Sequence, residues 1–170
     1  MQLIDGGRGW LPAALFAGIA VLDRITKWLA SERLVDGAVQ VIPNHLQFSL
    51  VHNSGIAFGM LDGADFAGKP LLLTGLSAGL LVAIVIFAVK SRPLPFLTGI
   101  GLAALLAGAA SNIADRVALG YVVDFIDMYV GTSHWPTYNV ADAAISSGVI
   151  LMLLDGVVEW RRARRADAAG

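Results

Sequence analysis

The sequence predicts an all-α polytopic membrane protein with four transmembrane helices and a small sheet on the outer face of the membrane. The chain of 170 residues is 56% hydrophobic and only 15% charged, which is more apolar surface than one soluble domain of this length can bury. Four long apolar stretches follow one another, and two of their connections are rich in β-branched and aromatic residues. The whole chain, 1–170, is therefore expected to form a single integral membrane domain.

The expected spans cover residues 11–30, 71–89, 94–114 and 143–158. The second and third carry no charged residue, and each approaches the ~20 residues that cross the hydrocarbon. The first has a short apolar part followed by Asp23, Arg24 and Lys27, and the fourth has Asp155 near one end. A cleaved signal peptide is the alternative for the first stretch, but its charges fall where a small-residue cleavage site should be, and three more spans follow.

Lysine and arginine predict the orientation, because they are enriched in cytoplasmic loops. The link KSRPLP between the second and third spans is short and basic, and four arginines lie between 161 and 165, in a tail that we expect to be disordered. With four spans, both termini are then cytoplasmic. The long connections, 31–70 and 115–141, face outward and place Asp124 and Asp142 near the outer surface.

These outer connections are expected to form a small sheet on the helical bundle. The stretch VQVIPNHLQFSLVHNSGIAFGML (39–61) predicts two short strands, with breaks at Pro43-Asn44 and at Asn53-Ser54-Gly55. YVVDFIDMYV (121–130) predicts another strand.

Asp142 lies in NVADAAI, which is typical of a helix start. Asn139 would be the N-cap, and an acid three residues later favours the helix dipole. This structural interpretation is the favoured one for the motif alone. It is compatible with a functional carboxylate, because a helix N-terminus helps to keep an acid ionised.

Asp124 lies inside the apolar run VVDFI. A single charge near lipid is costly, so this carboxylate is a functional candidate. Asp127, on the opposite face of the strand, is expected to be a solvated surface acid. If Asp124 and Asp142 meet away from water, they cannot both ionise and will share a proton. One could then take a proton from water while the other gives one to a carbonyl oxygen or a leaving amine, which is amide hydrolysis without a metal or covalent intermediate.

Two further polar groups adjoin the spans. Asp23 and Lys27 share a helical face and could form an ion pair or shape a polar pocket, whereas Arg24 is expected to extend to the surface. In SNIADR, Asn112 could cap the third helix, Arg116 suits its negative end, and the acid between them, Asp115, requires a partner. The small residues of the preceding AGAAS permit close helix packing.

Several other classes of site have weaker support. The chain has no cysteine, and a net charge of −1 argues against nucleic acid. His45, His52 and His134 show no metal-ligand spacing, so no metal or cofactor is expected. A Ser111–His134 pair lacks a nucleophile-elbow signature. An ion- or proton-coupled transporter would need ionisable residues at the middle of several spans, and a non-catalytic membrane scaffold would not explain Asp124.

The motifs in combination resemble the lipoprotein signal peptidase (signal peptidase II) family over nearly the whole chain. The matching segments are DRITK (23–27), NSGIAF (53–58, for N-x-G-x-A-F), AGAASNIADR (107–116, for G-G-x-x-G-N-x-x-D-R), VVDF (122–125) and YNVAD (138–142). Ala107 and Ser111 replace glycines of the third motif. Both are small, so close packing should survive, although glycine can take backbone conformations that they avoid.

The resemblance implies an aspartic endopeptidase of the bacterial cytoplasmic (inner) membrane, with its site near the periplasmic face under a small β-cradle. Its substrate would be a diacylglyceryl-modified prolipoprotein, cut just before the lipidated cysteine, and globomycin-type cyclic peptides would occupy the same cleft beside membrane lipids. Asp124 and Asp142 would be the catalytic dyad. The residues that match substrate- or inhibitor-site positions are Asn53, Asn112, Arg116, Asn139, Asp23 and Lys27.

Overall fold

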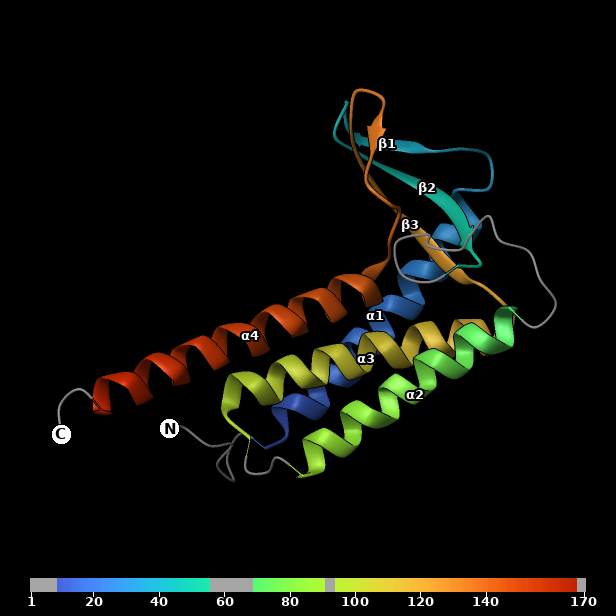
Figure 1. Cartoon of the computed structure of the whole chain (residues 1–170). Coiled ribbons are helices and arrows are strands. Elements are labelled where there is room, and N and C mark those ends of the chain that lie inside the picture. The colour runs from blue at the N-terminus through green and yellow to red at the C-terminus, as the bar shows by residue number, and fades with distance from the viewer. Residues whose placement is uncertain (1–8, 56–68, 91–93, 168–170) are drawn as a thin grey trace.

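The computed structural model describes residues 9–55, 69–90 and 94–167. This part contains four long helices and a four-stranded sheet: α1 (Leu11–Arg33), β1 (Val39–Ile42), β2 (Leu46–Asn53), α2 (Lys69–Lys90), α3 (Phe96–Leu119), β3 (Val122–Val130), β4 (Ser133–His134) and α4 (Val140–Asp167). The sheet projects from one end of the helical bundle, and α1 begins and α4 ends at the other end (Figure 1). The second half of NSGIAF (56–58) and half of KSRPLP (91–93) lie outside the described residues.

Three helices, Leu71–Lys90 of α2 together with α3 and α4, are long and apolar enough to cross a membrane. α1 has 23 residues but is not among them, and it carries Asp23, Arg24 and Lys27 within its length. The predicted helical membrane fold with a small sheet is confirmed, with three rather than four helices that meet this criterion.

The burial pattern of α1 is the reverse of that in a water-soluble helix. Asp23 and Lys27 are buried at 1% exposure each, whereas Leu22, Ile25 and Trp28 are about half exposed. A soluble helix turns its apolar side chains to the core and its charges to water. This reversed pattern suits a helix whose outer face contacts lipid and whose inner face lines a polar site.

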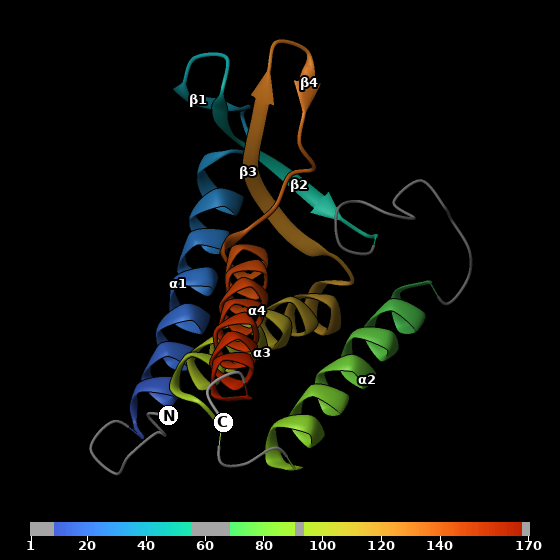
Figure 2. The same cartoon turned by 60° about the vertical axis from the view of Figure 1, so that its left-hand side comes forward.

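α3 lies between the other helices in the bundle (Figure 2). At its contact with α4 a Cβ added to Gly101 would lie 2.6 Å from the carbonyl oxygen of Gly148, and one added to Gly108 would clash with the carbonyl of Ala141. The expected close packing of small residues is therefore confirmed, and the methyl group of Ala107 is fully buried.

The helices α3 and α4 both extend further along the chain than predicted. α3 continues to Leu119, so Asn112 lies inside the helix and is not its cap. Gly120, with φ of 82°, ends the helix in the left-handed conformation and turns the chain into β3. α4 continues to Asp167, so the arginine-rich tail is helical and not disordered.

The sheet has the order β1-β2-β3-β4 with every pair antiparallel. The two predicted strand breaks are confirmed, and β4 is an addition that the sequence pattern did not predict. Phe125 of β3 packs with Ala30 and Leu34 at the end of α1, and it meets Phe48 edge to face at 6.0 Å. This contact fastens the sheet to the bundle.

A one-residue bulge interrupts the pairing of β2 with β3. Before it, Phe48 pairs with Ile126, whereas after it Val51 pairs with Asp124 and Asn53 with Val122. Paired residues share a face of the sheet. The bulge therefore moves Asn53 onto the face that carries Asp124, where an unbroken register would have placed His52.

Candidate active site

Two elements bring the predicted dyad together. Asp124 lies in the middle of β3 at 1% exposure, and Asp142 lies in the first turn of α4. The segment before α4 pairs with β3: the amide of Tyr138 donates to the oxygen of Ile126 (3.1 Å), and the amide of Ile126 donates to the oxygen of Tyr138 (2.8 Å). This pairing delivers Asn139 to the side of Asp124.

Asn139 contacts both aspartates. Its side-chain Nδ2 donates to Oδ1 of Asp124 (2.7 Å), and its main-chain N–H donates to Oδ2 of Asp142 (3.2 Å). Its Oδ1 accepts the main-chain N–H of Asp142 (3.0 Å), which completes a reciprocal cap of α4. The helix-start interpretation of Asp142 is thus confirmed, and the capping residue is also the residue that connects the two carboxylates.

Two more asparagines complete the dyad's surroundings. Asn53 Nδ2 donates to Oδ2 of Asp124 (2.8 Å), and Asn112 Nδ2 donates to Oδ1 of Asp142 (2.8 Å). Within the described residues each carboxylate is hydrogen-bonded by neutral N–H donors and pairs with no cation. Their protonation states are therefore not fixed by an ion pair.

The surroundings of Asp124 favour a proton. Burial in the sheet raises its pKa from the ordinary 3.8 to about 7; the hydrogen bonds of Asn53 and Asn139 lower it, and the nearby charge of Asp142 raises it. An acid with a pKa of about 7 exchanges its proton readily at neutral pH, as a general acid should.

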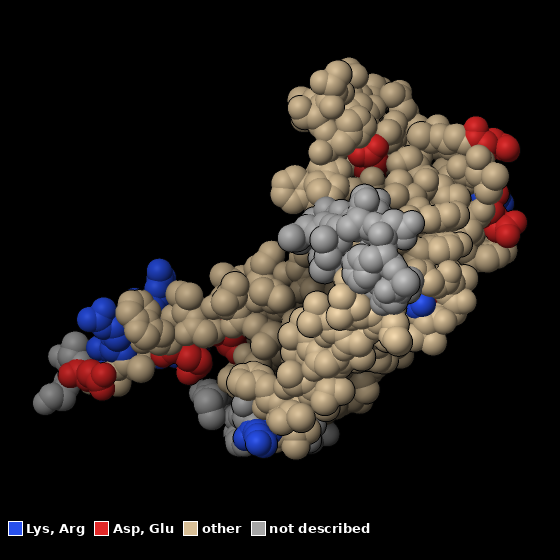
Figure 3. Space-filling model, turned by 45° about the vertical axis from the view of Figure 1, so that its right-hand side comes forward, with Lys and Arg blue, Asp and Glu red and all other residues tan. Residues whose placement is uncertain are grey.

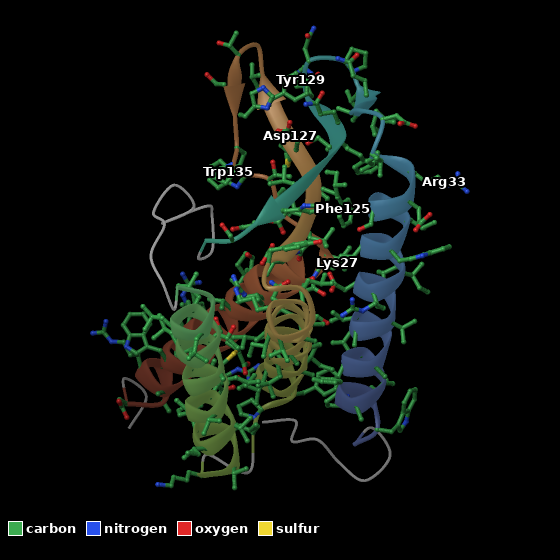
Figure 4. All side chains as sticks on the ribbon, turned by 90° about the vertical axis from the view of Figure 1, so that its right-hand side faces the viewer. Lys27, Arg33, Phe125, Asp127, Tyr129 and Trp135 are labelled. Carbon is green, nitrogen blue, oxygen red and sulfur yellow. The ribbon has the colours of Figure 1, made fainter. Side chains whose placement is uncertain are left out.

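A second polar cluster lies beside the dyad around Lys27, whose side chain points from α1 into the bundle (Figure 4). Its Nζ contacts Asp23 Oδ2 and Asp115 Oδ2, both at 2.8 Å, and donates to Asn112 Oδ1 at 2.9 Å. An ammonium group has three N–H donors, so all three are used. The predicted Asp23–Lys27 pair is confirmed within this larger cluster.

Arg24 and Asp115 complete this ion cluster. Arg24 was expected to extend to the surface, but its Nη2 lies 3.0 Å from Oδ1 of Asp115 while its side chain stays 55% exposed. The sequence indicated that Asp115 needed a partner, and Lys27 and Arg24 are its two cations. Two basic and two acidic side chains thus balance one another.

The ion cluster orients the dyad through two bonds. Lys27 holds the oxygen of Asn112, which turns the NH2 group of Asn112 toward Asp142. Asp23 Oδ1 accepts the N–H of Ala141 (2.9 Å), in the first turn of α4. The position of Asp142 therefore depends on α1 as well as on its own helix.

Arg116 contacts the turn that follows β2. Its Nη2 donates to the carbonyl oxygen of Gly55 (3.1 Å), and the amide of Gly55 donates to Oδ1 of Asn53 (2.8 Å). Asn53 is held in this way with its NH2 group toward Asp124. The structure brings the eight predicted site residues into one neighbourhood, and it adds Arg24 and Asp115 to them.

Asp127 is not a solvated surface acid. It is 5% exposed, and it accepts from Nε2 of Gln47 at 2.6 Å and contacts Nδ1 of His134 at 2.8 Å. Its neighbours on both sides cover it, because Gln47 is its partner in β2 and β4 carries His134. His134 therefore serves Asp127 within the sheet and is not paired with Ser111 of α3.

In the three described ranges, no group of three or more His, Asp or Glu side chains is placed to hold a metal ion.

Comparisons with known proteins agree on one family. A family model described as signal peptidase (SPase) II matches residues 15–158. Proteins named lipoprotein signal peptidase are similar to most of the chain. The one from Acinetobacter baylyi is 40% identical over 161 residues, covering 93% of this chain and 87% of that protein, and the one from Syntrophus aciditrophicus is 36% identical over 138 residues, covering 81% and 86%.

Solved structures are similar too. One described as a bacterial membrane enzyme superposes with a TM-score of 0.75 at 29% sequence identity and covers 88% of both chains. A second with the same description has the same TM-score at 27% identity, covering 85% of this chain and 91% of that one.

Proposed function

The chain belongs to the signal peptidase II family, and from that membership we propose that Asp124 and Asp142 are its catalytic pair. As a member of the family it is a membrane aspartic endopeptidase of bacteria, a hydrolase that acts on prolipoproteins. The transporter alternative has no support among the relatives, which are named as peptidases.

One observation carries the assignment of the pair: Asn139 donates to both carboxylates at once, through its side chain to Asp124 and its main chain to Asp142. Because one fully buried residue is hydrogen-bonded to both acids, it couples their positions. Because the donors are neutral amides, one proton can be shared between the acids, as hydrolysis by water requires.

We assign the two acids different resting states. Asp142 lies at the N-terminus of α4, where the helix dipole favours a negative charge, and it is the ionised partner. Asp124 has no helix terminus, and burial raises its pKa to about 7, so it carries the proton.

Hydrolysis then proceeds in two steps with the protons balanced. A water oxygen bonds to the scissile carbonyl carbon while its proton passes to Asp142 and the proton of Asp124 passes to the carbonyl oxygen. When the carbon–nitrogen bond breaks, Asp142 gives its proton to the leaving amine, and the intermediate's hydroxyl returns a proton to Asp124. The pair ends as it began.

The substrate follows from the family. We propose that the chain cuts a diacylglyceryl-modified prolipoprotein just before its lipidated cysteine, and that globomycin-type cyclic peptides compete for the same site. Asn53 and Asn112 border the pair and can present amide groups to a peptide backbone, whereas Asn139 is fully buried and its side chain is already hydrogen-bonded within the site. Asp23 and Lys27 support the residues around the pair and do not contact the peptide, since the N–H groups of Lys27 are already used. Arg116 supports the turn at Gly55.

We further propose that all four helices span the inner membrane, with both termini cytoplasmic and the catalytic pair at the periplasmic face. The reversed burial of α1 supports a fourth span. The sheet lies at one end of the bundle, and the start of α1 and the end of α4 lie at the other, which supports the orientation (Figure 1). The chain has no cysteine, so Asp36→Cys should react with a membrane-impermeant thiol reagent added to intact cells, and Ala166→Cys should react only after the cells are opened. The opposite pattern would reverse the orientation.

The catalytic pair is tested by cleavage of a purified diacylglyceryl-modified prolipoprotein in the presence of a chelator. Asp124→Asn and Asp142→Asn should each lower kcat by about 10²- to 10⁴-fold, as expected for loss of a general acid or base. Asp127→Asn is the matched control, because it removes another buried carboxylate of β3 that lies outside the pair. Near-normal activity in either dyad variant would refute the assignment.

A further inference from the structure

The C-terminal end of α4 carries a surface that the peptidase chemistry does not use. Four arginines, Arg161, Arg162, Arg164 and Arg165, lie in the last turns of the helix, and all are exposed. Blue side chains gather at this tip in the space-filling view (Figure 3). They lie at the end of the bundle opposite to the sheet.

Three of these arginines continue the outward face of α4. Ile150, Leu154 and Val157 are spaced by four and three residues and are 56%, 54% and 47% exposed. Continuing that spacing leads to Arg161 and Arg164, and Arg165 follows Arg161 by four residues. Side chains at i+3 and i+4 share one helical face. One stripe thus changes from apolar side chains to guanidinium groups as it reaches the end of the helix.

The fourth arginine, Arg162, lies two residues before Arg164 and therefore on the opposite side of the helix from it. Gly148 and Asp155 face α3: the carbonyl of Gly148 lies against Gly101, and Asp155 Oδ2 accepts the amide of Thr98 at 3.1 Å. Glu159 and Arg162 follow Asp155 by four and seven residues on that same side, and they contact each other at 2.8 Å. Arg162 therefore points away from the apolar stripe and is already paired with the carboxylate of Glu159.

The change along the stripe matches the layers of a bilayer. Exposed apolar side chains lie in the hydrocarbon, and lipid phosphates lie just beyond it. Trp160, 57% exposed and with the guanidinium of Arg164 5.1 Å from its ring, is a residue type of the membrane interface. Guanidinium groups bind phosphate oxygens with two parallel hydrogen bonds, which an ammonium cannot do.

We propose that Arg161, Arg164 and Arg165 form a binding site for the phosphate groups of anionic phospholipids that surround this end of α4. Charge complementarity and continuity with the lipid-facing stripe identify the occupant as lipid. The site also has a consequence for the other end of the helix. Arg161 lies nineteen residues after Asp142, a rise of about 28 Å, close to the roughly 30 Å of the hydrocarbon. A lipid clamp at Arg161 holds Asp142 at the opposite boundary.

The test is titration of the purified full-length protein with phosphatidylglycerol or phosphatidylcholine, with bound lipid counted by native mass spectrometry. The wild type should bind phosphatidylglycerol more tightly. Replacing Arg161, Arg164 and Arg165 together by Gln should weaken the binding of phosphatidylglycerol by about fivefold for each charge removed and leave the binding of phosphatidylcholine unchanged. The three Lys replacements keep the charge but lose the paired hydrogen bonds, so they should retain only part of the preference.

The matched control is a pair of single variants, Arg164→Gln and Arg162→Gln, which remove the same charge from the two faces. Only Arg164→Gln should weaken the binding of phosphatidylglycerol. Equal effects of the two, an unchanged triple Gln variant, or a wild type without preference would each overturn the proposal.

Two further measurements use only the wild-type protein. Raising ammonium acetate from about 0.1 to about 1 M shortens the range of electrostatic attraction from about 10 to about 3 Å and should remove the preference; a preference that survives would overturn the proposal. Inorganic phosphate at matched ionic strength should not displace the lipid, and displacement would mean a simple anion site.

Discussion

Two pairs of aspartates meet in this molecule, and they are held by different kinds of partner. Asp23 and Asp115 contact the cations Lys27 and Arg24. Asp124 and Asp142 contact only amide N–H donors within the described residues. A cation fixes a carboxylate in its ionised form, whereas an amide fixes its position and leaves its proton exchangeable. The first pair is thus suited to structure, and the second to acid–base chemistry.

The largest effect is expected from removing the buried cation. Lys27→Met keeps much of the side-chain volume but leaves Asp23 and Asp115 buried with less compensation, which should cost about 3–5 kcal/mol. Thermal unfolding in detergent measures the loss. Adding Asp23→Asn to Lys27→Met should recover part of the stability, and failure to recover any would mean that packing and not charge balance sets the role of Lys27.

The second prediction concerns the exchangeable proton of Asp124. Its folded pKa of about 7 lies above the ordinary 3.8, so the folded state binds more protons than the unfolded state between these values. The stability that this group contributes is complete below pH 4 and is lost as the pH rises through 7, with a slope of at most about 1.4 kcal/mol per pH unit.

Comparison of the wild type with Asp124→Asn by thermal unfolding from pH 4.5 to 8 isolates this contribution. The wild type should lose stability relative to the variant as the pH rises, and its kcat/KM should fall above pH 7. A constant difference between the two proteins would mean that Asp124 does not titrate in this range.

The third prediction concerns the asparagine side chains that donate hydrogen bonds to the dyad. The hydrogen bond from Asn53 lowers the pKa of Asp124, so Asn53→Ala should raise that pKa further and move the alkaline limb of the kcat/KM profile up by about one pH unit. Gln47→Ala is the control, because Gln47 lies in the same strand but donates to Asp127. A parallel fall in activity at every pH would instead indicate a purely structural role for Asn53.

The smallest effect is expected at Arg24. Its side chain is 55% exposed, and pairs that reach water contribute about 0–1 kcal/mol. Arg24→Gln should therefore change the melting temperature and the activity little, because Lys27 still holds Asp115. A loss of stability as large as that of Lys27→Met would show that the exposed cation and the buried cation contribute equally.

The sequence predicted the elements better than it predicted their contacts. Apolar length located the helices, and alternation located β2 and β3, because these signals are local. The partner of Arg24 could not be predicted, because Asp115 reaches it only through the packing of α3 on α1. Asp127 was wrongly assigned to the surface, because an alternating pattern does not show that β4 returns beside β3 and brings His134 to the carboxylate of Asp127.

The asparagines show the same difference between roles that depend on neighbouring residues in the sequence and roles that depend on tertiary contacts. Asn139 was predicted as a cap from its immediate neighbours, and the cap is confirmed. Its second role, donation to Asp124, depends on the pairing of Tyr138 with Ile126. Asn112 was expected to end a helix because SNIADR is polar. In the structure the polar side chains face the site while α3 continues past them to Leu119.

The bulge in β2 makes the length of that strand as important as its composition. Deleting Ser49 would remove the extra residue and leave Val51 opposite Asp124 and Asn53 opposite Val122, whereas deleting His52, beyond the bulge, would place Asn53 opposite Val123. Asn53 would then turn away from Asp124, although no residue of the dyad or its amide shell had been replaced. Mutational libraries that substitute residues will therefore miss this dependence, whereas deletion of the His52 codon should inactivate the enzyme and deletion of the Ser49 codon should preserve the pairing of Asn53.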